Sequence, residues 1–157
     1  MSGENLFVTN LLAGTIGKYT TSGATVNPSL VSGVVTPFAI AVSEENLFVT
    51  TGAYGVIGEY TTTGATVNPA LITTFGFMYG IALSDENLFV TDAIRGTIGK
   101  YTTSGIPVDA TLVSGLNQPV GIAVVFPSVA DRSSTWTLLL LGGAAAFGLN
   151  PLLRRRA

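Results

Sequence analysis

The sequence predicts an all-β domain made of three repeated units, followed by one apolar helix near the C-terminus. The hexapeptide ENLFVT begins at Glu4 and returns at Glu45 and Glu86, a spacing of 41 residues each time. Charged residues make up only 10% of the chain while Gly, Thr and β-branched residues are plentiful, which favours strands and tight turns over helices. Near the other end, the 21 residues between Arg132 and Arg154 carry no charge.

The three units are expected to be blades of four short strands each. The first two units are identical at 22 of 41 positions. A period in the low forties is typical of propeller blades and of some helical solenoids. Short β-prone runs cut by Gly, Pro, Asn and Ser favour the blades. The prediction is therefore a partial or small β-propeller in residues 4–127, with units 4–44, 45–85 and 86–125.

The second unit illustrates the four expected strands, at about 38–43, 46–51, 56–61 and 71–75. In the first, small residues alternate with large ones, as a crowded inner strand requires. The run Leu47-Phe48-Val49 is apolar on both faces and is expected to be covered by neighbouring blades. The third strand carries the recurring Gly-x-Ile-Gly-x-Tyr pattern, and a Thr-Thr-Ser/Thr-Gly turn leads to the outer strand.

These segments resemble blades of NHL-type β-propeller repeats over about residues 4–125. The run LNQPVGIAV at 116–124 and its counterparts VTPFAIAV and FMYGIAL are similar to the innermost strand of that family. The recurring Leu-Phe-Val and Ile-Gly-x-Tyr segments match its second and third strands. The family often has an acid just after the second strand, where this chain has Asn10, Thr51 and Asp92, so only the third unit conforms.

The order of the strands raises the question of how the blades close. The chain begins at a second strand and reaches a further first strand at 120–125, which we expect can complete the first blade and close a ring. Propellers normally have about four to eight blades, so three suggest a truncated gene product or part of an assembly. The expected absence of a signal peptide before Glu4 favours truncation.

Residues 128–157 are expected to be a C-terminal sorting signal with a transmembrane helix at about 134–153. The apolar run is long enough to span a bilayer, and the three arginines after it favour a cytoplasmic end. This layout resembles the PEP-CTERM class in its Val-Pro-Asp-x-x-Ser-Thr variant, which implies processing by an exosortase-type enzyme. An uncleaved membrane anchor is the alternative. The matching motif residues are Val129, Ala130, Asp131, Ser134 and Thr135, and the basic anchor is Arg154, Arg155 and Arg156.

The amino-acid composition excludes several kinds of catalytic and metal-binding chemistry. The chain has no Cys and no His, so it lacks thiolate ligands and the commonest general base. Its body is acidic, so we expect no nucleic-acid partner. We therefore expect no enzyme, no cofactor and no bound metal, but an exported envelope or extracellular-matrix protein with a structural role or a binding role toward protein or polysaccharide. The alternative is a fragment of a lactonase- or lyase-type propeller enzyme whose catalytic blades are missing from this chain. A gene fragment with no function of its own is a third interpretation.

Two places in the repeats are candidates for ligand contact. Asp92 and Arg95 are the charged residues of the loop that follows the second strand, where the other units have Asn10 with Ala13 and Thr51 with Tyr54. Such loops project from one rim of a propeller, so a rim contact is one interpretation and a solvated pair is the other. The recurring acidic turns at 44–45 and 85–86 offer oxygen ligands for Ca²⁺, but they lack the spacing of a calcium loop and are explained by turn chemistry.

Overall fold

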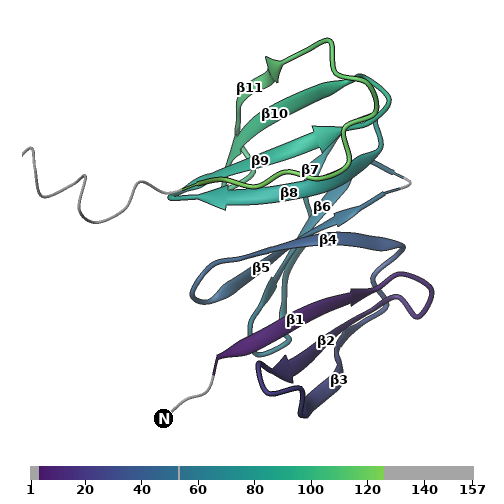
Figure 1. Cartoon of the computed structure of the whole chain (residues 1–157), viewed down its shortest axis with the longest axis vertical. Coiled ribbons are helices and arrows are strands. Elements are labelled where there is room, and N and C mark those ends of the chain that lie inside the picture. Colours follow the sequence, from purple (N-terminus) through teal and green to yellow (C-terminus); the bar gives the residue numbers. More distant parts are fainter. Residues whose placement is uncertain (1–3, 53, 126–157) are drawn as a thin grey trace, which may run out of the picture. The chain divides into compact units, whose positions relative to one another are not determined.

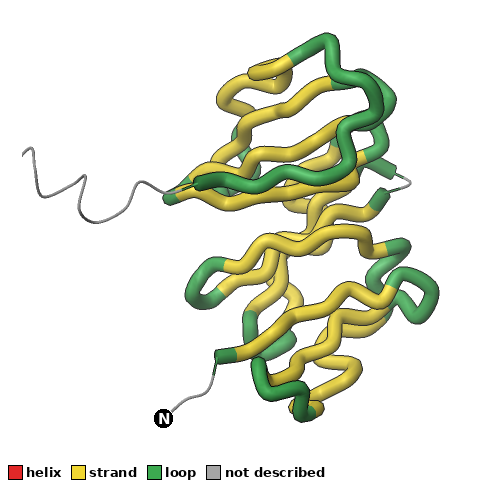
Figure 2. The backbone as a smooth tube through the Cα atoms, in the orientation of Figure 1, coloured by secondary structure: helices red, strands yellow, loops and turns green. Residues whose placement is uncertain are grey.

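The computed structural model describes residues 4–52 and 54–125, and these residues form three antiparallel sheets and no helix (Figures 1 and 2). The first sheet has three strands and the other two have four each. Within this part of the chain there is accordingly no helix long and apolar enough to cross a membrane. The expected transmembrane helix at 134–153 lies outside the described residues.

The sheets follow one another along the chain, and in each sheet consecutive strands are neighbours. The first sheet contains β1 (Asn5–Asn10), β2 (Thr15–Thr20) and β3 (Thr25–Ser32). The second contains β4 (Pro37–Val42), β5 (Asn46–Thr51), β6 (Val56–Thr61) and β7 (Thr66–Thr73). The third contains β8 (Met78–Ser84), β9 (Asn87–Asp92), β10 (Thr97–Thr102) and β11 (Pro107–Val113). The predicted all-β repeat architecture is therefore confirmed.

The apolar residues of the repeat bury themselves between neighbouring sheets. One core joins the first and second sheets, and a second core joins the second and third sheets. Leu47 and Val49 of β5 and Leu88 of β9 are all fully buried at these two junctions. The run that is apolar on both faces is thus covered on both sides, as the sequence pattern predicts.

One threonine of the repeat makes the same contact at every junction. Its hydroxyl donates to a backbone carbonyl of the inner-strand segment that follows the outer strand, 29 residues later in the chain. These bonds run from Thr9 to Phe38 (2.8 Å), from Thr50 to Tyr79 (3.0 Å) and from Thr91 to Val120 (3.3 Å). Because Thr9 and Thr50 each bind the backbone of the following sheet, these contacts stabilise the junctions between sheets as well as each sheet.

The same hydroxyls also accept hydrogen bonds from backbone N–H groups where the pairing of the inner strands shifts register. The pairing of β4 with β5 shifts register between Pro37 and Ile40, and the pairing of β8 with β9 shifts between Met78 and Ile81. At the first shift the Ala39 N–H donates to the Thr50 hydroxyl at 3.0 Å. The corresponding bond at the second shift joins Gly80 to Thr91 (2.8 Å). The side chain therefore replaces a ladder hydrogen bond that the bulge removes.

The outer strand differs from its expected bounds. In the second unit β7 begins at Thr66, five residues before the expected start at 71, and it includes Asn68 and Pro69. Asn-Pro is typical of a turn. An outermost strand tolerates proline, however, because no further strand needs the N–H group that proline lacks. Register shifts in the pairing of β6 with β7 accommodate this segment, and the Asn68 carboxamide accepts a bond from the Ala70 N–H.

The expected closure of the ring by residues 120–125 is not observed in the described residues. Val120 lies against Thr91 of the third sheet, in the relation that Tyr79 has to Thr50. Residues 114–125 form no strand, and β1 pairs with β2 alone. Within one chain the segment therefore lies against the third sheet and does not complete the first sheet.

Candidate functional site

The candidate site lies on the rim formed by two kinds of loop. One kind joins the second strand of a unit to its third strand, and the other kind leads from the outer strand to the next inner strand. A backbone hydrogen bond ties one loop to the other in each unit: Val34 to Gly14 (3.0 Å), Thr74 to Gly55 (2.8 Å) and Leu116 to Gly96 (2.9 Å). These glycines have φ angles of 61–63° and would bring a Cβ against the partner loop, so no other residue fits there without strain.

Asp92 and Arg95 lie together on this rim in the third unit. Asp92 is buried at the end of β9, and its Oδ1 accepts bonds from the backbone N–H groups of Ile94 (3.0 Å) and Arg95 (3.1 Å). Its Oδ2 accepts a bond from Arg95 Nη1 at 2.7 Å, which is the single ion pair found among the described residues. Asp92 therefore fixes both the loop and the direction of the guanidinium.

A glycine from the neighbouring loop makes room for this pair. A Cβ on Gly76 would collide with the Asp92 carboxylate and would lie 2.9 Å from Arg95 Nη1. The φ angle of Gly76 is not in the left-handed region, so the requirement here is space and not backbone conformation. The ion pair is thus enclosed by the loop that leads into β8.

Two open pockets flank the Arg95 side chain, which is 47% exposed. The first has a volume of about 590 Å³ and is lined by Phe77 and Tyr79 together with polar groups of Asn117 and Gln118. The second, of about 530 Å³, is lined by aromatic side chains that include Tyr54 and Phe75. Both volumes fall within the usual range of small-molecule sites. An arginine between two aromatic pockets suits a ligand with flat apolar parts and an oxygen acceptor.

The aromatic residues of this rim contact one another across two sheets. The Phe38 and Tyr79 rings lie 4.6 Å apart at a tilt of 59°, and Phe77 lies 6.3 Å from Tyr79. Such tilted pairs are stabilising and hold the rings in fixed positions. The aromatic wall of the first pocket is therefore supported by the inner strand of the preceding unit.

Tyr101 lies behind the ion pair. It lines a third pocket of about 270 Å³ together with Asp92 and Arg95. Burial is the main cause that raises the pKa of the Tyr101 phenol; the nearby Arg95 lowers it and Asp92 raises it. The phenol therefore keeps its proton at neutral pH, and it can donate a hydrogen bond but does not act as a base there.

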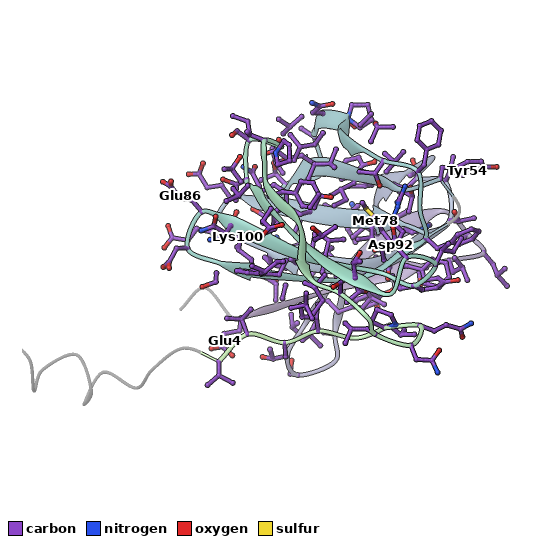
Figure 3. All side chains as sticks on the ribbon, turned by 90° about the horizontal axis from the view of Figure 1, so that it is seen from above. Glu4, Tyr54, Met78, Glu86, Asp92 and Lys100 are labelled. Atoms are coloured by element: carbon purple, nitrogen blue, oxygen red, sulfur yellow. The ribbon has the colours of Figure 1, made fainter. Side chains whose placement is uncertain are left out.

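The acidic turns lie at the opposite end of the strands from the loop rim. Figure 3 shows Glu86 and Lys100 toward one end of the third sheet, and Asp92 with Tyr54 toward the other. In residues 4–52 and 54–125 no group of three His, Cys, Asp or Glu side chains is arranged to hold a metal ion. The structure thus brings Asp92 and Arg95 together but keeps the recurring acids apart from them.

The aromatic partners of Arg95 were not among the residues singled out from the sequence. Tyr54 occupies the same repeat position as Arg95, and Phe77 and Gly76 come from a loop that varies between units. The signal that could have found these residues is that they differ from their counterparts 41 residues away in an otherwise close repeat. The sorting-motif residues 129–135 and the arginines 154–156 lie outside the described residues.

No family model matches the chain, and neither does any curated protein. Solved structures do match it. Virginiamycin B lyase from Staphylococcus aureus has a TM-score of 0.58 and 21% identity, covering 80% of this chain and 45% of the lyase. A catalytically inactive variant of that lyase with quinupristin has a TM-score of 0.62 and 23% identity over the same shares. A streptogramin B lyase has a TM-score of 0.60 and 22% identity, covering 76% of this chain and 41% of the lyase.

A computationally designed protein, Ika4, is also similar in fold, with a TM-score of 0.55 and 13% identity. At these identities the likeness concerns the fold, which is that of part of a β-propeller. The chain spans less than half the length of the lyases that it matches.

These comparisons overturn the expectation that the protein is not an enzyme. That expectation rested on the missing His and Cys, whereas structures that share the fold include a lyase. The absence of His and Cys excludes only certain general bases, nucleophiles and metal ligands, and it does not exclude catalysis. Carboxylates, tyrosines and charge stabilisation by arginine remain available.

Proposed function

We propose that this chain contributes three blades to a lyase-type β-propeller enzyme, and that Arg95 holds the substrate at the loop rim. Support comes first from the fold, which is similar to that of lyases. The observation that carries the site is the half-exposed Arg95 guanidinium, fixed by buried Asp92 between two aromatic pockets. Of the three cations in the described residues, Lys18 and Lys100 instead lie over the rings of Phe7 and Phe89.

The proposed chemical role of Arg95 follows from what a lyase does. In an elimination that breaks a carbon–oxygen bond, a base takes a proton from carbon and the electron pair of the broken bond stays on the leaving oxygen. A positioned guanidinium stabilises the negative charge on that oxygen. Asp92 is a positioning residue in this scheme, because it contacts Arg95 and not the substrate. The sequence has no histidine, so this rim would bind the substrate and stabilise charge, and the base that removes the proton would lie elsewhere.

Quinupristin, which accompanies one of the similar lyases, is the probe for this proposal. We expect saturable binding to the full chain by isothermal titration calorimetry, and a loss of at least about tenfold in affinity for Arg95→Ala. Lys100→Ala is the matched control, because it removes a cation outside the rim pockets. Consumption of quinupristin is followed by chromatography and mass spectrometry. Equal affinity of the wild-type and Arg95→Ala chains, or no binding at all, would overturn the proposed function.

We also propose that residues 129–157 are an exosortase-processed sorting signal that carries the protein to the bacterial envelope and holds it briefly in the membrane. The support is the order of motif, uncharged run and arginine cluster in the sequence. The test is terminal peptide mapping of the protein isolated from its native cells. A mature C-terminus near Asp131 is expected, and a membrane-bound form that keeps Arg154–Arg156 would contradict the proposal.

A further inference from the structure

The two ends of the described chain are complementary to each other. The first sheet has no inner strand, because β1 pairs with β2 alone among the described residues. Residues 119–124, in contrast, have the sequence of an inner strand, PVGIAV, which differs from the PFAIAV of β4 at two positions. They lie on the third sheet through the Thr91 bond but have no second strand of their own unit beside them.

The side chains of β1 are exposed where their repeat counterparts are buried. Leu6 and Val8 are 47% and 42% exposed. Their counterparts are at most 2% exposed: Leu47 and Val49 in the second sheet, and Leu88 and Val90 in the third. The outward face of β1 therefore lacks the neighbouring sheet that covers this face in the other two units.

The third sheet also has an uncovered face, on the side away from the second sheet. In the second sheet the side chains that pack toward the next unit are buried, with Phe48 at 1% and Ile72 at 5% exposure. Their counterparts in the third sheet are Phe89, which is only half-buried, and Val113, which is 38% exposed. An uncovered face of the β1 type and an uncovered face that receives it are thus present on the same chain.

A glycine contact repeats in the same way. A Cβ on Gly64 would lie 2.5 Å from the Leu30 carbonyl of the preceding sheet, and one on Gly105 would lie 2.6 Å from the Leu71 carbonyl. The counterpart in the first unit, Gly23, has nothing within 4 Å. The residue that would be its partner by repeat position is Leu112 of the third sheet, which is 44% exposed.

We infer that two copies of this chain associate head to tail, and that residues 119–124 of each copy complete the first sheet of the other. The register follows from the pairing of β4 with β5, where Val42 faces Leu47 and Ile40 faces Val49. Val124 of one copy then faces Leu6 of the other, and Ile122 faces Val8. Because each copy has one donor segment and one acceptor edge, two copies satisfy both contacts and the assembly closes.

The size of the resulting ring supports two copies. Two sets of three sheets give six four-stranded sheets, which lies within the usual range of about four to eight blades. One set corresponds to 45% of the length of virginiamycin B lyase, so two sets approach the length of that chain. The backbone before residues 119–124 already has the conformation found before β4. Gln118 has a left-handed φ of 47°, and Thr36, at the same repeat position just before β4, has 44°.

This inference rests on the proposed function only in taking the chain as part of a larger propeller, and its test does not use the substrate. The full chain in mild detergent is measured by native mass spectrometry and by light scattering after size exclusion. We expect twice the mass of one chain. Val8→Lys, which places a charge in the new interface, is expected to give single chains. The matched control Leu12→Lys changes a fully exposed leucine in the loop after β1 and is expected to leave the pair intact.

A cysteine pair tests the register itself, because the chain has no natural cysteine. Leu6→Cys combined with Val124→Cys is expected to give a covalently linked pair of chains after mild oxidation. Leu12→Cys combined with Val124→Cys is expected not to cross-link. If Val8→Lys fails to fold, this cross-link still tests whether two chains associate.

Several results would overturn the two-copy ring. They are a wild-type chain that stays single at tens of micromolar, a disulfide closed within one chain, and a ladder of larger oligomers. A single chain that binds quinupristin through Arg95 would reject the two-copy ring and leave the proposed function standing. A two-copy assembly without binding would do the reverse.

Discussion

Replacing Thr50 by valine tests how strongly the repeated threonine contact holds neighbouring sheets together. The Thr50 side chain is fully buried, and its hydroxyl makes two short hydrogen bonds. It accepts from the Ala39 N–H at 3.0 Å and donates to the Tyr79 carbonyl at 3.0 Å. Valine has nearly the same volume as threonine, so the cost of the substitution comes from the lost hydroxyl and not from a cavity.

The expected loss can be worked from these two bonds. Each hydrogen bond contributes roughly 1 kcal/mol net, and a buried polar group left without a partner costs about 1–3 kcal/mol. The Ala39 N–H lies at the bulge of β4, where the strand ladder offers no substitute. We therefore expect Thr50→Val to lower the free energy of unfolding by about 2–4 kcal/mol.

Urea denaturation of the full chain, followed by far-ultraviolet circular dichroism, measures this loss. Thr9→Val is the matched control, because the same repeat position there has the single, exposed bond to Phe38. Its expected cost is about 1 kcal/mol. Equal effects of the two substitutions, or a neutral Thr50→Val, would refute the argument that this hydroxyl serves both the bulge and the next sheet.

Three further substitutions test other contacts. Burial raises the pKa of Glu59 above its ordinary value of 4.5, so the folded chain holds this proton more tightly than the unfolded chain and loses that advantage as pH rises through the folded pKa. Urea titrations at about pH 4 and pH 7 should therefore show wild-type stability falling relative to Glu59→Gln as the pH increases. Gly76→Ala should displace the Asp92–Arg95 pair and weaken quinupristin binding, whereas unchanged calorimetry would show that the loop absorbs the methyl group. Gly55→Ala, at a φ of 61° and against the Thr74 carbonyl, should cost about 1–3 kcal/mol by urea denaturation, and a loss below about 0.5 kcal/mol would be inconsistent with the rim geometry.

The inner parts of each blade could be predicted from the sequence because several signals agree there. The expected strands at 46–51 and 56–61 have the bounds of β5 and β6. The outer strand was placed five residues too late, since Asn68-Pro69 resembles a turn when its position at the edge of the sheet is unknown. Propensity is local, whereas tolerance of proline depends on whether a further strand lies beyond.

The candidate site was predicted in part. Asp92 and Arg95 stood out as charges in an otherwise uncharged loop position, and the structure joins them at 2.7 Å. Phe77 and Gly76 did not stand out, because their nearness to Arg95 depends on how two loops of neighbouring units meet. The expectation of a non-enzyme failed for a related reason: a census of residue types does not show how the remaining polar groups are placed.

A crystal structure of the full chain with quinupristin is the most direct test of the proposed function. We expect electron density for the ligand at the loop rim, with an oxygen atom within hydrogen-bond distance of the Arg95 guanidinium and a ring against Phe77 or Tyr79. Density at the opposite rim near the acidic turns, or a ligand that leaves Arg95 without contact, would contradict it.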